Sequence, residues 1–238
     1  MATRFKLGDI AVDVVLKDIR NIHLGVYPPA GHVRISAPSR TDLDTIRMFV
    51  ISRLDWIRRQ QRKLREQERE TPREFLDRES HYVWGKRYLL RIVERERAPS
   101  IALTPSRMVL SVRPGTALAE RQDFIARWYR EQIRAALPAL LRVWEPRVGV
   151  RVNGIFIQQM KTKWGSCNAR AGTIRLNTEI AKKPNECLEY VLVHEMLHLV
   201  EPTHNAHFIA LIDRFMPRWQ LLRQRLNRLP VRHEDWIY

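Results

Sequence analysis

The stretch HEMLHLVEPTH, residues 194–204, decides how the chain is interpreted, because it places three histidines and a glutamate directly after the apolar run YVLV. Histidine and glutamate are costly to bury unless a partner satisfies them. His194 and His198 are four positions apart, so both imidazoles project from the same face of a helix. Two nitrogens on one face can hold a zinc ion at about 2.0–2.1 Å each. The stretch therefore predicts a metal site on a helix.

A third histidine completes the predicted ligand set. A zinc ion that takes part in a reaction needs three protein ligands and one open position. His204 is the predicted third ligand, because Pro202 ends the helix and the chain can then turn back towards the metal. His207 is the alternative, but we expect it inside a further helix that Asn205 caps. The expected cofactor is one zinc ion per chain.

Glu195 holds the position of the general base in an H-E-x-x-H arrangement. Zinc lowers the pKa of its bound water towards 7 and polarises the carbonyl group of a substrate. Glu195 would take the proton of that water and pass it to the leaving amine. The sequence thus predicts a zinc-dependent peptidase that acts on proteins or peptides without a covalent intermediate.

The segments before this helix read as strands. Apolar and polar residues alternate in NGIFIQQMKTKWGSC, residues 153–167, and in GTIRLNTEI, residues 172–180. We expect an antiparallel hairpin that leads into the histidine helix, which would begin near Pro184. A long helix is expected before the hairpin, over about residues 117–144.

The first part of the chain is predicted to be rich in strands. FKLGDIAVDVVL and IHLGVYPPAGHVRISAP alternate apolar and polar residues, and more short strands are expected between residues 82 and 112. Between these two groups, apolar residues three or four apart over residues 43–57 predict one long helix, which Ser39 or Thr41 would cap. No internal repeat is evident.

Two of these segments resemble the YgjP-like zinc metallopeptidases, relatives of the SprT-like proteases. They are KTKWGSCNARAGTIRLN, residues 161–177, and YVLVHEMLHLVEPTHNAHF, residues 190–208. The family pattern has a basic residue before W-G-S-C, a glycine, an L-N pair, the H-E-x-x-H helix, and a third histidine four residues before a phenylalanine. The matching residues here are Lys163, Trp164, Gly165, Ser166, Cys167, Gly172, Leu176, Asn177, His194, Glu195, His198, His204 and Phe208.

The resemblance implies an α+β fold in two parts. An N-terminal β-rich region with one long helix would span residues 1–113, and a zincin-like metallopeptidase domain would span residues 114–238. The second part would contain the antiparallel hairpin and the active-site HExxH helix. The spacing of the third ligand also matches metzincins, but Glu201 stands where they have glycine.

The W-G-S-C segment allows several interpretations. Gly165 would permit a close approach of the backbone, and Lys163, Trp164 and Asn177 are candidate substrate-binding residues in the cleft. A nucleophilic Cys167 is disfavoured, because a thiolate near zinc would become a ligand. Met216 could form an apolar floor under the metal or belong to the core.

Composition limits the compartment and suggests a partner. The 238 residues include 42 Lys and Arg against 26 Asp and Glu, so the formal net charge is +16. This excess indicates nucleic acid as a possible partner through a basic surface, as do the links of SprT-like relatives to proteolysis on DNA. The chain has two cysteines, no secretory leader and no apolar run long enough for a membrane span, so we expect a cytoplasmic protein.

Two other functions compete with the peptidase. A nucleic-acid-binding module with a structural zinc would need a fourth ligand, such as Cys167, Cys187 or His207. A peptidase that has lost its activity and serves as an interaction partner would not need Glu195. The intact glutamate argues against the latter.

Overall fold

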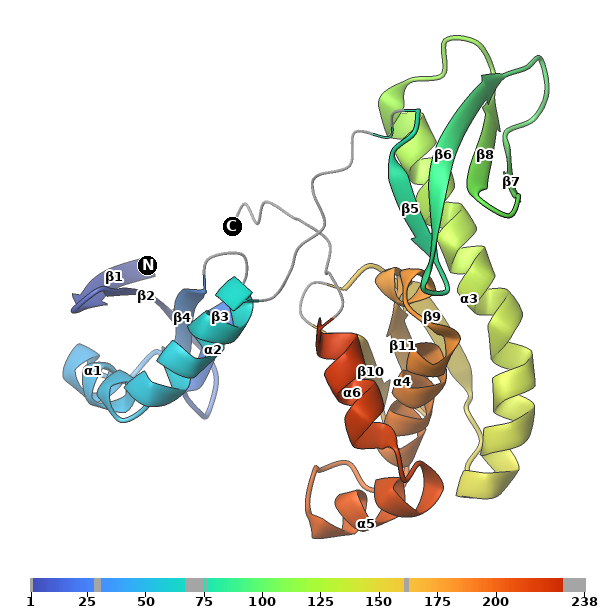
Figure 1. Cartoon of the computed structure of the whole chain (residues 1–238). Helices are drawn as coiled ribbons and strands as arrows, with labels where there is room; N and C mark the ends of the chain where they lie inside the picture. Colours follow the sequence, from blue (N-terminus) through green and yellow to red (C-terminus); the bar gives the residue numbers. More distant parts are fainter. Residues whose placement is uncertain (1, 28–30, 67–74, 76, 161–162, 229–238) are drawn as a thin grey trace. The chain divides into compact units, whose positions relative to one another are not determined.

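The computed structural model describes residues 2–27, 31–66, 75, 77–160 and 163–228 (Figure 1). The chain forms two compact units, one within residues 1–72 and one within residues 73–229. Each unit has its own buried apolar cluster. Both units combine strands and helices, which confirms the predicted α+β class.

The first unit is a mixed sheet covered by two helices. The sheet order is β1-β2-β4-β3, and apolar side chains of β2 and β4, such as Val12, Val33 and Ile35, are completely buried. Val33 and Ile35 are two positions apart on β4 and share one face of the strand. The elements are β1 (Ala2–Leu7), β2 (Ile10–Lys17), β3 (His23–Tyr27), β4 (His32–Pro38), α1 (Leu43–Ile51) and α2 (Leu54–Glu66).

The predicted single helix over residues 43–57 is wrong in one respect, because it is divided into α1 and α2. The first helix ends at Ile51, with Ser52 as its C-cap, whose N–H donates to the carbonyl of Met48, and the second begins at Leu54. The predicted caps are also wrong. Asp42 is the N-cap, and its carboxylate accepts a hydrogen bond from the N–H of Thr45 at 2.7 Å.

The second unit begins with a sheet of the same topology as the first. Its order is β5-β6-β8-β7, and its elements are β5 (Ser80–Val83), β6 (Lys86–Glu94), β7 (Ser100–Leu103) and β8 (Arg107–Val112). In both sheets the first two strands are antiparallel, the second and fourth are parallel, and the third and fourth are antiparallel. The strand arrangement therefore repeats, although no repeat was expected from the sequence.

A long helix joins this sheet to the part of the unit that carries the histidines. The predicted helix over residues 117–144 is confirmed as α3 (Leu118–Val148), which runs past both sheets of the unit in Figure 1. The hydroxyl of Tyr129 donates to the carbonyl of Tyr82 on β5 at 2.9 Å. Near the other end, Trp144 Nε1 donates to the carboxylate of Glu189 at 2.9 Å. α3 thus connects the second sheet to the histidine helix.

The remaining elements form a three-stranded sheet, of order β10-β11-β9, and the helices that pack around it. The predicted antiparallel hairpin is confirmed for β10 and β11, but β9 pairs with β11 in parallel. β11 lies between β9 and β10, so the first predicted strand is on the far side of β11 from β10. The elements are β9 (Gly154–Gln158), β10 (Gly165–Asn168), β11 (Thr173–Asn177), η1 (Thr178–Lys182), α4 (Asn185–Leu197), α5 (Ala206–Phe215) and α6 (Trp219–Arg228).

The domain boundary and the character of the helices can be compared with the expectations from the sequence. Strands β5 to β8 share a compact unit with the histidine helix, whereas the predicted division at residue 113 assigns them to the N-terminal region. That division stays a prediction for the extent of the metallopeptidase domain. Among the described helices, none combines the length and the apolar character that crossing a bilayer requires.

Candidate active site

The histidine helix α4 is held at both ends by backbone hydrogen bonds. The helix begins at Asn185, shortly after η1. Two N–H groups of the turn between β5 and β6 donate to carbonyl groups of η1. These bonds run from Trp84 to the carbonyl of Ala181 at 2.8 Å and from Gly85 to that of Lys182 at 3.2 Å. The helix ends at Leu197, earlier than predicted, and the N–H of Glu201 donates to the Leu197 carbonyl at 2.8 Å.

The three predicted ligands come together at the end of α4. His194 lies in the last turn, His198 is the C-cap, and His204 stands directly before Asn205, the predicted and observed N-cap of α5. One ligand atom of each imidazole lies within 4.8 Å of the others. The Nε2 atoms of His194 and His204 are 3.0 Å apart. This arrangement could hold a metal ion.

The protonation of these rings suits a metal. Burial lowers the pKa of His194 to about 3, and the charges of His198, His204 and Arg223 add to the effect. Burial also lowers the pKa of His204. Both imidazoles are therefore neutral near pH 7, the form that binds a cation. His198 Nδ1 lies 3.0 Å from the carbonyl of Glu201, to which it can donate, and this tautomer leaves the lone pair on Nε2 for a metal.

Glu201 organises the loop that carries the third histidine, and sequence reasoning missed this role. Its carboxylate accepts hydrogen bonds from the N–H of Thr203 at 3.1 Å and from the Thr203 hydroxyl at 2.8 Å. These bonds, with one from Asn205, lower the pKa of Glu201 to about 2. An anionic side chain with two Thr203 donors fixes the turn between His198 and His204. The sequence signal for this turn is a glutamate, Glu201, followed two residues later by Thr203, which can donate to its carboxylate.

The alternative ligands lie elsewhere. His207 Nδ1 is 3.5 Å from the Glu201 carboxylate and is not part of the histidine group. Burial raises the pKa of Cys167 to about 11, and the nearby charge of Glu195 raises it too. Burial likewise raises the pKa of Cys187 to about 11. Both cysteines are thiols near neutral pH, which does not suit a nucleophile. Neither cysteine belongs to the histidine group.

A phenylalanine forms the floor beneath the three imidazoles. The ring of Phe208 is stacked on His198, with centroids 4.6 Å apart, and lies edge-on to His194 and His204 at 5.0 and 4.7 Å. It is 1% exposed, so the ligand rings rest on a fixed apolar surface. Met216, the residue considered for this role, packs on the core and does not line the cleft at the histidines.

Glu195 is buried beside the histidines and against the edge of the sheet. Its side chain is on α4, and the residue is 6% exposed. Burial raises the pKa of this carboxyl to about 7, and the charge of Lys163 opposes the rise. A Cβ atom built on Gly165 would lie 2.8 Å from both Cγ and Oε1 of Glu195. Only glycine allows strand β10 to come this close, as the sequence suggested for Gly165.

The sequence model of one family matches residues 20–229 and is described as the YgjP-like metallopeptidase domain. The chain belongs to the YgjP-like family. The resemblance predicted from the motif segments is thereby confirmed, and the protein is a metallopeptidase by family. The comparison with curated proteins found no match to this chain.

Two solved structures are similar to part of this YgjP-like chain. The metallopeptidase zymogen abylysin of Pyrococcus abyssi is 23% identical, with a TM-score of 0.35, over 37% of this chain and 90% of its own. The zymogen jannalysin of Methanocaldococcus jannaschii is 21% identical, with a TM-score of 0.32, over 40% of this chain and 86% of its own. No conclusion rests on likenesses this partial.

The YgjP-like site opens into a cleft of about 520 Å³ between β10 and helices α4, α5 and α6. Lys163 and Trp164, two of the three predicted substrate-binding residues, line this cleft together with His194, Glu195 and His204. Most of the other side chains that line the cleft are apolar or aromatic, and α6 contributes the cation Arg223. The remaining lining residues are Gly165, Tyr190, Val191, Phe208, Ile209, Trp219, Arg223, Leu226 and Asn227.

The third predicted substrate-binding residue, Asn177, lies behind the cleft. It is 5% exposed, and its side-chain N–H groups donate to the carbonyls of Met160 at 2.8 Å and Lys163 at 2.9 Å. Its side-chain oxygen accepts from the N–H of Glu179 at 3.2 Å. Asn177 therefore fixes the backbone that leads to Trp164. Direct contact of Asn177 with substrate stays a prediction.

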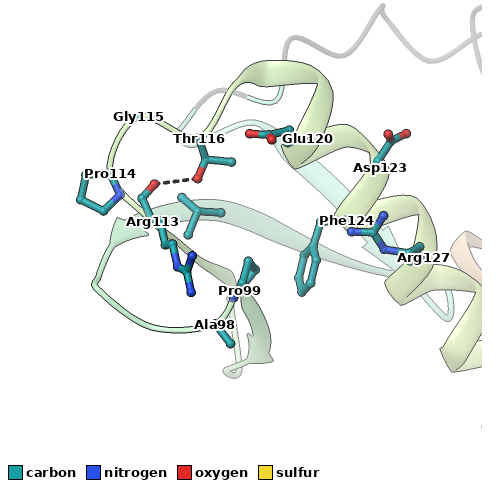
Figure 2. A pocket seen from close by; sticks show the side chains of 11 residues that line it. Ala98, Pro99, Arg113, Pro114, Gly115, Thr116, Glu120, Asp123, Phe124 and Arg127 are labelled. Carbon is teal, nitrogen blue, oxygen red and sulfur yellow. Dashed lines mark hydrogen bonds between the residues drawn. The ribbon is translucent and has the colours of Figure 1, made fainter.

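A second cleft of about 590 Å³ lies between the end of β8 and the start of α3 (Figure 2). Its carboxylates and guanidinium groups are exposed, and Glu120 accepts a hydrogen bond from the N–H of Ala117 at 3.0 Å to cap α3. The Thr116 hydroxyl donates to the carbonyl of Arg113 at 2.7 Å. These contacts stabilise a turn, and the described residues of this cleft include no histidine or cysteine.

Proposed function

We propose that the protein is a zinc-dependent endopeptidase with His194, His198 and His204 as ligands and Glu195 as general base. The observation that carries this proposal is the convergence of three imidazoles beside one buried carboxyl group at the cleft. Family membership makes the chain a metallopeptidase. The choice of zinc, one ion per chain, follows from the preference of this metal for three imidazole ligands and an open position.

The residues of the cleft can perform peptide hydrolysis. When bound, Zn²⁺ supplies Lewis acidity, which polarises a carbonyl group and favours deprotonation of water. The Glu195 carboxylate accepts the proton of the attacking water and then delivers it to the leaving amine. Its raised pKa, near 7, suits both transfers, since the group can hold a proton and release it near neutral pH. Phe208 keeps the ligand rings in place and excludes water from beneath them.

The residues around β10 support a substrate-binding role next to this chemistry. Trp164 offers an aromatic wall, and the ammonium group of Lys183 lies 5.8 Å from the centroid of its ring. Asn177 holds the carbonyl of Lys163, so the cleft wall is supported from behind. We propose Lys163 and Trp164 as substrate contacts and Asn177 as a positioning residue.

The alternative function, a nucleic-acid-binding module with a structural zinc, has less support. A closed structural site needs a fourth protein ligand. Within the described ranges, the group that could hold a metal contains the three histidines and no cysteine, and His207 faces Glu201 instead. The open fourth position favours catalysis over a structural role.

Metal content tests the proposal directly. We expect the purified protein to hold one zinc ion per chain and the His198→Ala variant to lose most of it, because one of three ligands is removed. Mass spectrometry of native protein prepared without chelator measures both values. Digestion of casein should stop on chelation and return with added zinc. Wild-type protein that contains no zinc, and gains none on titration, would contradict the assignment.

Nucleic acid remains a proposed partner through the basic surface. The sequence near the C-terminus predicts a basic stripe of Arg218, Arg225, Arg228 and Arg232. The structure reduces this stripe, since Arg225 pairs with Glu186 and Arg232 lies outside the described residues. The exposed arginines of α2 are better candidates for contact with nucleic acid than those of α6. One of them, Arg58, lies 3.9 Å from Asp9. The exposed set is Arg58, Arg59, Arg62 and Arg65. The two free cysteines suit the reducing cytoplasm that we propose as the compartment.

Binding to DNA should depend steeply on salt. Positive side chains on phosphates release counterions, so we expect affinity to be largely independent of sequence and to fall between about 50 and about 200 mM salt. Fluorescence anisotropy with labelled single- and double-stranded DNA measures this. Replacing Arg59 and Arg62 by glutamine should weaken binding, whereas Arg175→Gln on β11 serves as a control. Absence of binding at the lower salt would remove nucleic acid from the partners.

A further inference from the structure

The cleft at the histidines has an excess of positive charge that the hydrolytic chemistry does not use. Its charged side chains, the histidines aside, are Lys163, Arg223 and Glu195. Two of these three side chains, Lys163 and Arg223, are cations. A bound metal ion would add further positive charge. The cleft therefore attracts negatively charged groups.

Arg223 is placed by its helix to face this cleft. Trp219, Leu226 and Asn227 also line it, and these residues stand four positions before and three and four positions after Arg223 on α6. The guanidinium carbon lies 5.9 Å from the centroid of the Trp219 ring, which supports the side chain along the wall of the cleft.

Arg223 has no structural ion pair to explain its position. The ion pair between α6 and α4 is formed by a different residue, Arg225, with Glu186. Within the described part of the chain, no carboxylate lies within ion-pair distance of Arg223 or Lys163. A guanidinium group presents a planar fork of donors that matches a carboxylate. The unpaired fork in an apolar cleft suits a carboxylate brought by the substrate.

We propose that Arg223, assisted by Lys163, makes the cleft selective for peptides that carry a carboxylate next to an apolar residue. The apolar side chain would contact Trp164, Ile209 and Leu226, which line the same cleft. The carboxylate can belong to an acidic side chain or to the C-terminus of a peptide. This inference rests on the proposed function for the identity of the cleft, and it specifies the class of substrate.

Peptide binding tests the proposal without requiring hydrolysis. The probes are short peptides with a leucine followed by glutamate or glutamine, each with a free or an amidated C-terminus, labelled with tetramethylrhodamine. Their Kd values are measured by fluorescence anisotropy at about 150 mM salt, where long-range attraction is largely screened. The full chain is used after chelation, so that a carboxylate cannot gain affinity by ligating zinc, and again after zinc is added.

We expect the peptides with a carboxylate to bind about tenfold more tightly than the uncharged peptide, as charge-assisted hydrogen bonds allow. Arg223→Gln should abolish this ratio, and Arg223→Lys should retain part of it. Arg214→Gln is the matched control, because this exposed arginine on α5 does not line the cleft. Comparison of glutamate with the free C-terminus shows which carboxylate is selected.

Two outcomes would overturn the proposal. One is equal affinity of the wild-type protein for the charged and uncharged peptides. The other is a ratio that survives in Arg223→Gln. Because the readout is binding, these outcomes are separate from a failure of the peptidase assignment, in which peptides bind and are never cleaved.

Discussion

Replacement of Glu195 by glutamine is expected to lower kcat for peptide hydrolysis by about 10²–10⁴-fold, the contribution typical of a positioned general base. Glutamine keeps the size and polarity of the side chain but cannot accept the proton of the attacking water. The fold and the zinc content should not change, since the proposed ligands are the three histidines that pack on Phe208. Digestion of casein by matched amounts of zinc-loaded protein measures the effect.

A shorter carboxylate provides the control. Glu195→Asp keeps the base but withdraws it from the cleft, so its rate should lie between those of the wild type and Glu195→Gln. Both variants should hold as much zinc as the wild type. Cleavage by Glu195→Gln at the wild-type rate would show that another group is the base.

Replacement of Gly165 by alanine is expected to reduce kcat by about 10²-fold, the loss that a misplacement of roughly 1 Å can cause. The added Cβ would lie 2.8 Å from Glu195 Cγ and Oε1 and 2.9 Å from Val191 Cγ1. Both residues belong to the buried helix α4, so the glutamate must shift. Steady-state kinetics with the same substrate, together with zinc content, measures the change.

The sheet offers a matched control for this substitution. Gly154 lies on β9 of the same sheet, and a Cβ there would have ordinary contacts, the nearest being Thr173 Cγ2 at 3.8 Å. Gly154→Ala should therefore keep full activity. An equal loss in both variants would indicate a general effect on the sheet, and no loss in Gly165→Ala would contradict the importance of the close approach.

The three histidines could be predicted because their arrangement is local. Within twelve residues, the spacing of His194 and His198, the proline stop and the cap at Asn205 were enough to expect the histidines together, and the structure places them so. The family was equally accessible from two motif segments. Local periodicity and turn chemistry carry this information without knowledge of the tertiary fold.

Other parts of the site depend on contacts that sequence spacing does not record. Arg223 lies 19 positions beyond His204, and only the docking of α6 places it in the cleft. Asn177 was expected to contact substrate, whereas its amide satisfies backbone carbonyls of a segment that passes behind it. Alternation along β9 identified a strand but could not show that it pairs in parallel with β11, because the period is the same in either direction.

The two four-stranded sheets have the same topology, and each begins with a turn between two antiparallel strands. These two turns are under unequal constraint. Gly8 and Gly85 both have a positive φ, +60° and +79°, but no atom lies within 4 Å of a Cβ at Gly8. At Gly85 a Cβ would meet Pro184 at 2.8 Å, in the turn that braces the start of α4. The turn at Gly8 is constrained only by its own backbone conformation, whereas the turn at Gly85 is also constrained by its contact with the start of α4. A side chain larger than glycine should therefore be tolerated better at Gly8 than at Gly85.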